Sequence, residues 1–495
     1  MAKLFLFGIG GTGSRVIKSL TMLLASGVEM PNTDEVVPII IDPDATNGDM
    51  TRTVEMLEQY RRIRAAGFSG TKGFFKTKIS TLKSLSDQEK SATTLGETFQ
   101  YNINGTKEGR FRDFIDYSLL DATNKAFVDM LYSQENLDLK LDEGFKGNPN
   151  IGSVVLNQFK YSNELRQFAS LFREGDRIFI VSSIFGGTGA AGFPLLLKNL
   201  RNADSEHLAN HAFIQNARIG AITVMPYFGV DPKAGGKIDK GTFTSKTKSA
   251  LSYYHRSIDG PNALNAFYYI GDNLSQDYNY AEGSQAQQNR AHLVELISAM
   301  GIIDFMSVSD SEMRTENGKA VNALHREYGI KEDVNPLDFT GLPDDSRARF
   351  ASCLTQFSYF SLYMRQQFGA SLGNQPWSKN GKVKLDSFFT TQPFFAKVRD
   401  FTNRYWEWLD EMARNERAFR PFDMATNEGS LYKFVVNIEQ KGGFLGLNRS
   451  WSYGYFDDRL NAAERAIGDP PAEQKFLNTF YQATADIVKE KFEVL

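Results

Sequence analysis

The sequence predicts an α/β fold in which helices cover both faces of a mostly parallel β-sheet. Two apolar segments, residues 3–7 and 177–182, each run directly into a glycine-rich turn that opens a helical pattern. Further short apolar segments lie at residues 36–41, 219–225 and 266–270. Strands that are apolar on both faces and alternate with helices are typical of parallel sheets. Such sheets bind ligands at the carboxyl ends of their strands, where both glycine turns lie.

The composition describes a large chain with little overall charge. Its 495 residues are 41% hydrophobic, which is enough for more than one domain. The net charge of −3 gives no overall electrostatic reason to bind nucleic acid or an anionic membrane. One cysteine, Cys353, excludes an intrachain disulfide framework, and no apolar run reaches the roughly 18 residues of a membrane span. We therefore expect a soluble cytoplasmic protein with no leader segment.

The two glycine-rich turns have the features of phosphate-binding loops. Glycines let backbone N–H groups approach an anion closely, and the N-terminus of the following helix adds partial positive charge. The competing interpretation is that these glycines only permit tight packing of each helix on its strand. The residues that we expect at the phosphates are Gly10, Gly11, Thr12 and Gly13 of the first turn and Gly186, Gly187, Thr188 and Gly189 of the second.

Several short motifs resemble, in order, those of the tubulin/FtsZ superfamily of nucleotide-dependent filament proteins. The two glycine turns are similar to the first phosphate loop and the signature loop of that family. The acidic turn at Asp42 and Asp44 resembles its second loop, and the segment beginning Asn148-Pro149 resembles the γ-phosphate-sensing loop. Pro226, which precedes two aromatic residues, is similar to the turn that meets the sugar.

This resemblance implies a domain organisation, a ligand and a partner. It implies a Rossmann-like nucleotide-binding domain over residues 1–300, with residues 50–141 as an insertion or helical elaboration and residues 285–300 as a central helix. The resemblance fades beyond Asp304, and the residues themselves predict a divergent C-terminal domain over 301–495, α+β or helical, with aromatic-rich helices. The ligand would be GTP or GDP with Mg²⁺, and the partner a second copy bound head to tail, or an adaptor protein. Asp42 and Asp44 would reach Mg²⁺ through water, with an Asx-type turn as the competing interpretation.

Four polar residues are candidates for contact with the base. Gln285 and Asn289 share one face of the expected central helix, and Asn273 follows the preceding strand. Ordinary surface amides are the competing interpretation for these three. Arg15 stands where FtsZ-like sequences carry an asparagine near the base. An arginine there would contact a phosphate or stack on the base, so guanine and adenine nucleotides both stay open.

Asp304 is the candidate catalytic residue. By resemblance it is the first acid of a loop in which one subunit orients water against the nucleotide of the next. Ile302 and Ser307 replace the other two polar residues of that pattern. The competing interpretation is therefore a loop cap in a relative that hydrolyses poorly, which would act as a nucleotide-dependent switch or scaffold.

Two other enzyme classes share part of the pattern. Asp42 at the end of a second strand also fits a Rossmann oxidoreductase that binds a dinucleotide, and the first glycine turn also fits an E1-like adenylating enzyme. Neither class gives a role to the second glycine turn or to the segment at Asn148. The five histidines show no metal-ligand spacing, so we expect no structural zinc.

Overall fold

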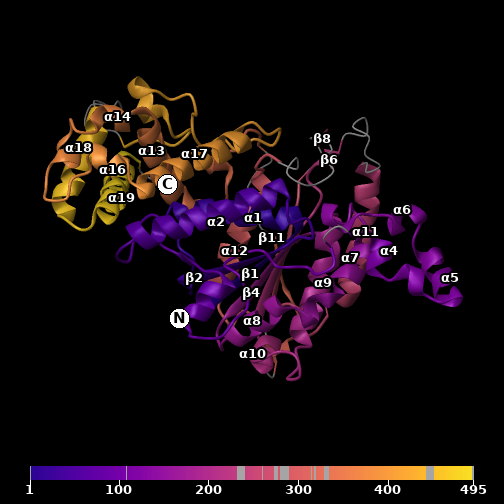
Figure 1. The fold of residues 1–495 in the computed structure, drawn as a ribbon. Helices are drawn as coiled ribbons and strands as arrows, with labels where there is room; N and C mark the ends of the chain where they lie inside the picture. The colour runs from indigo at the N-terminus through magenta and orange to yellow at the C-terminus, as the bar shows by residue number, and fades with distance from the viewer. Residues whose placement is uncertain are drawn as a thin grey trace.

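A seven-stranded parallel sheet forms the centre of this computed structural model (Figure 1). The structure describes residues 2–106, 109–230, 240–258, 260–272, 277–278, 289–313, 315–316, 319–327, 334–441 and 451–492. The strand order is β11-β7-β5-β4-β1-β2-β3, and each neighbouring pair is parallel. The strands are β1 (Lys3–Ile9), β2 (Glu35–Ile41), β3 (Lys78–Ile79), β4 (Arg177–Ser183), β5 (Arg218–Val224), β7 (Ala266–Ile270) and β11 (Leu324–Glu327). The predicted α/β class with a parallel sheet is confirmed.

Helices cover both faces of the sheet. One face carries α1 (Gly10–Ala25), α2 (Gly48–Gly67) and α12 (Leu293–Ser307), and the other carries α7 (Pro149–Leu156), α8 (Asn163–Leu171) and α9 (Gly187–Arg201). Alternation along the strands explains the division, because successive side chains point to opposite faces. Phe179 of β4 packs on Phe305 of α12, whereas Phe5 of β1 packs on Phe168 of α8.

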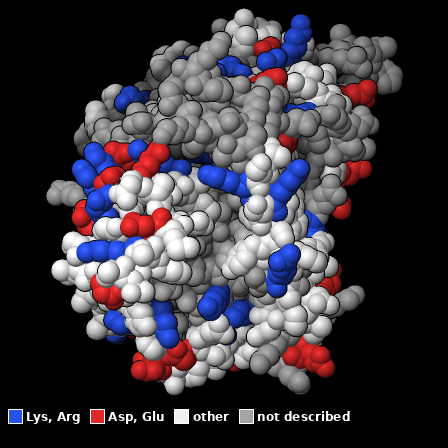
Figure 2. All heavy atoms as spheres, turned by 90° about the vertical axis from the view of Figure 1, so that its right-hand side faces the viewer, with Lys and Arg blue, Asp and Glu red and all other residues white. Residues whose placement is uncertain are grey.

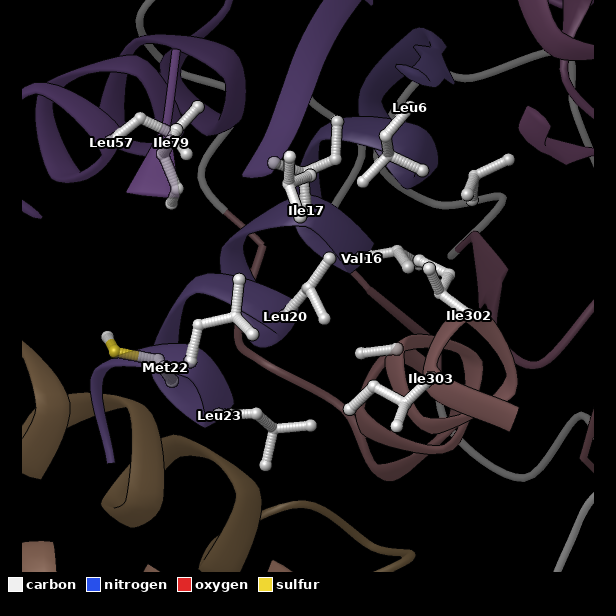
Figure 3. Close-up of a cluster of buried hydrophobic side chains, with 14 of the residues drawn as sticks. Leu6, Val16, Ile17, Leu20, Met22, Leu23, Leu57, Ile79, Ile302 and Ile303 are labelled. Atoms are coloured by element: carbon white, nitrogen blue, oxygen red, sulfur yellow. The ribbon is translucent and has the colours of Figure 1, made fainter. Parts of the chain in front are cut away.

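Helix α1 lies in the middle of the apolar core. Figure 3 shows its side chains Val16, Leu20 and Leu23 on the side that faces Ile302 and Ile303 of α12. All five are nearly inaccessible to solvent. A helix buried on almost every side must satisfy its polar residues internally. Ser14 and Thr21 donate to carbonyl oxygens one turn earlier in α1. Three others, Arg15, Lys18 and Ser19, bond to residues that are far away in the sequence.

The C-terminal part of the chain packs on α1 and α2 (Figure 1). Its main helices are α13 (Asp344–Gln366), α17 (Pro393–Ala413), α18 (Tyr453–Ile467) and α19 (Ala472–Lys491). Aromatic rings dominate the contact, since Phe74 packs on Phe357, Phe360 and Tyr481. The indole nitrogen of Trp408 donates a hydrogen bond to Ser19 of α1 at 3.3 Å. The helix that carries the first glycine turn is therefore in direct contact with the C-terminal helices.

The remaining elements include an arm that extends from the side of α7 and α9 (Figure 1). The arm contains α4 (Phe111–Phe114), η1 (Tyr117–Leu119), α5 (Ala122–Leu131) and α6 (Gln134–Leu137). Other helices are α3 (Leu82–Gln88), α10 (His211–Gln215), α11 (Lys240–Ser257), α14 (Phe368–Ser371), α15 (Pro376–Lys379) and α16 (Ser387–Thr390). Short 3₁₀ helices are η2 (Leu141–Glu143), η3 (Asn157–Tyr161), η6 (Phe339–Gly341) and η7 (Glu428–Lys433). The strand pairs β6 (Gly229–Val230) with β8 (Asp277–Tyr278) and β9 (Thr315–Glu316) with β10 (Lys319–Ala320) lie outside the main sheet.

Charge is dispersed over the surface that carries the arm. Among the described residues on this side, Figure 2 shows Lys and Arg interspersed with Asp and Glu. This distribution agrees with the small net charge of the chain. In the part of the chain that the structure describes, no helix has the length and apolar character needed to cross a membrane.

Candidate functional site

Three helices begin at the carboxyl edge of the sheet without a side-chain cap. Helix α1 begins at Gly10, α9 at Gly187 and α7 at Pro149, and none receives a hydrogen bond from its N-cap side chain. None of the three first turns carries an acidic residue. The first backbone N–H groups of a helix have no partner inside the helix, and the helix dipole places partial positive charge there. Each end therefore offers donors and positive potential that no side-chain cap offsets.

The three helix ends lie against one another. A Cβ atom built on Gly10 would lie 3.5 Å from Cβ of Thr188 and 3.7 Å from the backbone nitrogen of Gly189. A Cβ atom built on Gly187 would lie 3.1 Å from the backbone nitrogen of Asn148. The structure thus brings both glycine turns, which follow the neighbouring strands β1 and β4, into one place with the segment at Asn148, which follows no strand.

The glycines of the two turns differ in what surrounds them. Gly13 and Gly189 pack tightly, because a Cβ atom on either would lie 2.6 Å from a backbone atom of the preceding strand. Gly10 has a φ angle of +73°, which favours glycine over any other residue. Gly11 is different: it is half-buried, and only Nη1 of Arg15 lies near its virtual Cβ, at 3.5 Å. A Cβ atom at position 11 would therefore fit, with Arg15 as its near neighbour.

Arg15 lies inside the protein and joins four elements. Its Nε donates to Oε1 of Glu295 at 2.6 Å, and Nη1 donates to Oδ2 of Asp49 at 3.0 Å. Its Nη2 donates to the hydroxyl of Tyr227 at 2.8 Å and to Thr12 at 3.4 Å. Burial opposes the charge, but Tyr227, Glu295 and Asp49 together hold the pKa of Arg15 well above its usual range. In this structure the guanidinium forms a buried ionic hub, in place of the predicted contact with base or phosphate.

Asn289, another expected base contact, lies beside the same hub. Its backbone N–H and its side-chain amide both donate to the carboxylate of Asp49, at 3.0 and 2.9 Å. Arg52 also donates to Asp49, at 2.7 Å, and to the carbonyl of Asn289. The side-chain amide is therefore engaged with the protein. Asn273 and Gln285 lie outside the described residues.

The sequence interpretation missed Asp49 and Glu295, although local signals for both exist. Asp49 follows the N-cap Asn47 of α2, whose side chain accepts hydrogen bonds from the N–H groups of residues 49 and 50. Glu295 stands three residues after His292, and the two form a capping box at the start of α12. Acidic residues are common in the first turn of a helix, so neither pattern identifies a partner for Arg15.

Hydrogen bonds between its own residues hold the acidic turn after β2. The N–H of Asp44 donates to Oδ1 of Asp42 at 3.1 Å, and the N–H of Thr46 donates to Oδ1 of Asp44 at 3.1 Å. These are the bonds of the competing Asx-turn interpretation. Burial is the main cause that raises the pKa of Asp42 to about 7, and the carboxylates of Asp44 and Asp49 raise it further. A bound cation would offset this repulsion.

Asn148 and Pro226, two further residues expected at the nucleotide, lie within the described part of the structure. The side-chain amide of Asn148 donates to the carbonyls of Phe145 and Lys146, at 3.2 and 3.3 Å, which shapes the turn before Pro149. Lys246 of α11 donates to the carbonyl of Gly147 and brings a positive charge to this turn. Pro226 is half-buried and immediately precedes Tyr227 of the hub.

Asp304 lies within a helix rather than in a loop. The sequence predicted a central helix over residues 285–300, whereas α12 spans Leu293–Ser307 because apolar residues continue its buried surface to Met306. Asp304 is 3% exposed. Its carboxylate accepts two hydrogen bonds from Arg326, at 2.6 and 2.9 Å, and one from Tyr268 at 2.9 Å.

Asp304 and the three converging helix ends lie at opposite edges of the sheet. Arg177, the first residue of β4, donates to the carbonyl oxygens of Phe305 and Val308 at the end of α12. Helix α12 has 15 residues, so its ends lie about 20 Å apart. Asp304 therefore cannot reach a ligand at the helix ends of its own chain.

A group of potential metal ligands lies away from this site. Ligand atoms of Asp204, Glu206 and His207 lie within 4.8 Å of one another in the loop after α9. Nδ1 of His207 is 2.6 Å from Oδ1 of Asp204, and Lys160 is 3.3 Å from the other carboxylate oxygen. The sequence interpretation had found no such group. The ion pairs of Asp204 with His207 and Lys160 account for the arrangement of this group.

His292 gives the N-terminus of α12 a pH dependence. Its Nδ1 accepts the N–H of Val294 at 3.1 Å, and burial lowers the pKa of His292 from 6.5 to about 4. The unfolded chain binds a proton at this side chain below about pH 6.5, and the folded chain only below about pH 4. The free energy of unfolding should therefore fall by about 3 kcal/mol from this group as the pH falls through that window.

The variant His292→Asn separates this effect from other titrations. Asparagine keeps a side-chain acceptor for the cap but has no proton to gain. Urea unfolding at several values between pH 7 and pH 4 should show a smaller acid loss in His292→Asn than in the wild type. Equal losses in both proteins would mean that His292 does not titrate in this way.

Comparisons with known proteins give distant structural likenesses. No protein-family model matches the sequence, and no curated protein matches it. The chain is similar to CetZ from Methanosaeta thermophila strain DSM 6194, at 12% identity over 64% of this chain and 57% of that chain, with a TM-score of 0.26. A GTPγS-bound protofilament of CetZ2 from Haloferax volcanii shares 11% identity over 63% of this chain and 61% of that chain, with a TM-score of 0.27.

A third likeness covers more of the chain. A GTPγS-form protofilament of TubZ from Bacillus thuringiensis serovar israelensis shares 10% identity over 85% of this chain and 81% of that chain, at a TM-score of 0.27. The matches to the two CetZ structures span about three fifths of their lengths. At such TM-scores these likenesses do not decide function, which has to be argued from the site of this chain.

Proposed function

We propose that this protein binds a guanine nucleotide at the converging N-termini of α1, α7 and α9 and associates head to tail with further copies. The supporting observation is that three uncapped helix ends meet at the carboxyl edge of one parallel sheet. One such end binds a single anionic group, whereas three adjoining ends match the several charges of a polyphosphate. Backbone donors fixed in place also cost little reorganisation when the ligand binds.

In the two glycine turns, some residues would contact the phosphates and others would hold the backbone in position. Gly11, Gly186 and Thr188 are half-buried and lie on the open side of the turns. The buried Gly10, Gly13, Gly187 and Gly189 hold the backbone of those turns in position, and Thr12 contacts Arg15. Lys246 would add positive charge beside Asn148. Asn273 and Gln285 are proposed at the base, because Arg15 and Asn289 are engaged with Asp49.

The acidic turn after β2 is the proposed site of a magnesium ion. Carboxylate oxygens are the ligands that Mg²⁺ prefers, and the raised pKa of Asp42 shows that its negative charge is under-compensated. Asp42 and Asp44 would hold the ion through water molecules. When bound, the ion would neutralise phosphate charge.

Head-to-tail association would place Asp304 of one copy near the nucleotide of the next. The carboxylate would first have to leave Arg326 and Tyr268, which occupy it in this structure. That observation favours a second candidate function, a nucleotide-dependent switch or scaffold that hydrolyses little.

Asp304→Asn separates the two candidates. If Asp304 of the next copy completes hydrolysis, GTP turnover per subunit should rise with protein concentration in the wild type and fall at least about tenfold in Asp304→Asn, with nucleotide affinity unchanged. Asparagine keeps the size and an acceptor for Arg326, so a folded variant is expected. Wild-type turnover that is negligible, or equal in the variant, would assign the switch or scaffold function.

The nucleotide that co-purifies tests the proposed function itself. Protein denatured after purification releases its ligand, which ion-pair chromatography identifies. GDP or GTP at near one equivalent per chain is expected. NAD would assign a dinucleotide enzyme in its place, because the phosphate loops would then serve a different ligand.

A further inference from the structure

Lys246 of α11 carries a positive charge that is not paired with a carboxylate. Its Nζ donates a hydrogen bond to the carbonyl of Gly147, and within the described part of the chain it forms no ion pair. The side chain is half-buried, and burial alone lowers the pKa of Lys246. Lys3 and Lys475, which are more deeply buried, each pair with a carboxylate. A buried ammonium normally has such a partner, so the place of Lys246 in the fold requires an explanation.

The ammonium of Lys246 lies where α7 meets α9. Gly147 immediately precedes the N-cap of α7, and a Cβ atom built on Gly187 at the start of α9 would lie 3.1 Å from the nitrogen of Gly147. Helix α11 reaches this point because its second half packs on α9, where the rings of Tyr254 and Phe193 are 5.4 Å apart (Figure 1). Lys246 therefore extends from a third element to the converging helix ends.

The turn before α7 contains an ion pair of its own, which does not include Lys246. The carboxylate of Glu143 lies 2.5 Å from Nζ of Lys146 and 3.7 Å from Nζ of Lys140. The hydrogen bond from Lys146 is the main cause that lowers the pKa of Glu143. The first turn of α7 carries no acidic residue. The charge of Lys246 therefore adds to the positive potential of the α7 N-terminus.

Other cations beside the helix ends are engaged with acids. Arg15 donates to Glu295 and Asp49, and Arg52 donates to Asp49. Lys18 of α1 lies 3.5 Å from the carboxylate of Glu411. If one of these three cations turned to a phosphate, it would leave a carboxylate without its partner. The lysine of α11 would give up no ion pair within the described part of the chain.

The three helix ends form a row with α9 in the middle. Helix α9 contacts α1 at Gly10 and contacts the turn before α7 at Gly187. Glu295 near the start of α12 bonds to Arg15 of α1, so α12 begins at the α1 end of the row. Gln285, which is proposed at the base, precedes α12 in the sequence. A nucleotide with its base on that side would extend its phosphates toward α7, where the lysine of α11 lies.

We propose that Lys246 binds the third phosphate of the nucleotide and thereby makes the site selective for the triphosphate over the diphosphate. An ammonium has three donors, so Nζ can keep its bond to Gly147 while it donates to phosphate oxygens. A diphosphate would occupy the positions at α1 and α9 and leave Lys246 unengaged. This inference rests on the proposed nucleotide site and names the side chain that would distinguish GTP from GDP there.

The variant Lys246→Met tests this selectivity, because methionine keeps an unbranched side chain without the charge. Loss of a hydrogen bond between charged groups should lower GTP affinity by roughly tenfold or more. Affinity for GDP should stay close to that of the wild type. The matched control is Lys248→Met, two positions along α11, where the side chain is exposed. Isothermal titration with GTP and with GDP, each with Mg²⁺, should give wild-type affinities for this control.

Three results would overturn the inference while the proposed nucleotide site stands. One is a Lys246→Met protein that binds GTP as tightly as the wild type. The second is an equal loss of affinity for GTP and GDP in a folded Lys246→Met protein, which would assign the lysine to holding the turn at Gly147. The third is a wild type that binds GTP and GDP equally well. A wild type that binds neither nucleotide would remove the proposed site, and this inference with it. Thermal unfolding of each variant checks that it is folded.

Discussion

Replacing Gly11 with aspartate should reduce nucleotide affinity by roughly 100-fold or more while leaving the protein folded. Gly11 is half-buried in the first turn of α1, and the one atom within 4 Å of a Cβ atom built there is Nη1 of Arg15, at 3.5 Å. An acidic residue in a first turn interacts favourably with the helix dipole, so the unfolding temperature should stay the same or rise. The same carboxylate would occupy the position of an anionic ligand and repel it.

Opposite effects on stability and binding make this substitution diagnostic. Gly11→Ala is the control, because it adds the Cβ atom without the charge. Isothermal titration with GTP and Mg²⁺ gives the affinities, and a thermal scan gives the unfolding temperatures. Wild-type affinity in a folded Gly11→Asp protein would mean that the first turn does not face the ligand.

Replacing Arg15 with methionine should lower the free energy of unfolding by about 3–5 kcal/mol. The guanidinium is buried and serves Glu295, Asp49 and Tyr227 at once, so its removal leaves buried carboxylates without their cation. Methionine fills a similar volume, which limits the cavity contribution. Urea unfolding measures the loss.

A surface ion pair and a double variant serve as controls for Arg15. Arg404 pairs with Glu55 at 2.9 Å on the surface, so Arg404→Met should cost no more than about 1 kcal/mol. Adding Glu295→Gln to Arg15→Met should recover part of the loss, because one uncompensated charge is then removed. A loss in Arg15→Met no larger than in Arg404→Met would mean that the hub does not hold α1, α2 and α12 together.

The meeting of the two glycine turns could be predicted from the sequence because the pattern that predicts it is local. Each glycine turn follows an apolar strand directly, and parallel strands place their carboxyl ends at one edge. The convergence of the turns at Gly10 and Gly187 follows from that rule together with the pairing of β1 with β4, whereas Asn148 follows no strand and is brought there by the packing of α7 on α9. No partner needs to be known for such a prediction.

The charged residues could not be predicted because their partners are distant in sequence. Arg15 meets Glu295 across 280 positions, and Asp304 meets Arg326 from a separate strand. Their positions in the sequence motifs suggested that Arg15 contacts the ligand and that Asp304 activates water. Glu295 and Asp304 both belong to α12, so the position of this helix in the fold determines both ion pairs.

The boundaries of α12 show how a local signal was missed. The sequence suggested that the helix starts at Gln285. Helix α12 starts at Leu293, where His292 and Glu295 form a capping box. The expected helix ended at residue 300, yet Gly301 lies inside α12. Its virtual Cβ would be 3.3 Å from Ile222 of β5, so the glycine allows close packing on the sheet. The helix therefore continues through Asp304.

The affinity of the wild-type protein for a series of ligands with fewer and fewer phosphates tests the central claim most directly. Titrations with GTP, GDP, GMP and guanosine, each with Mg²⁺, compare the contribution of successive phosphates at a constant base. If the three helix ends form a polyphosphate site, affinity should fall at each step, by at least roughly tenfold between GDP and GMP. Guanosine that binds as tightly as GTP, or a protein that binds none of the four, would contradict the claim.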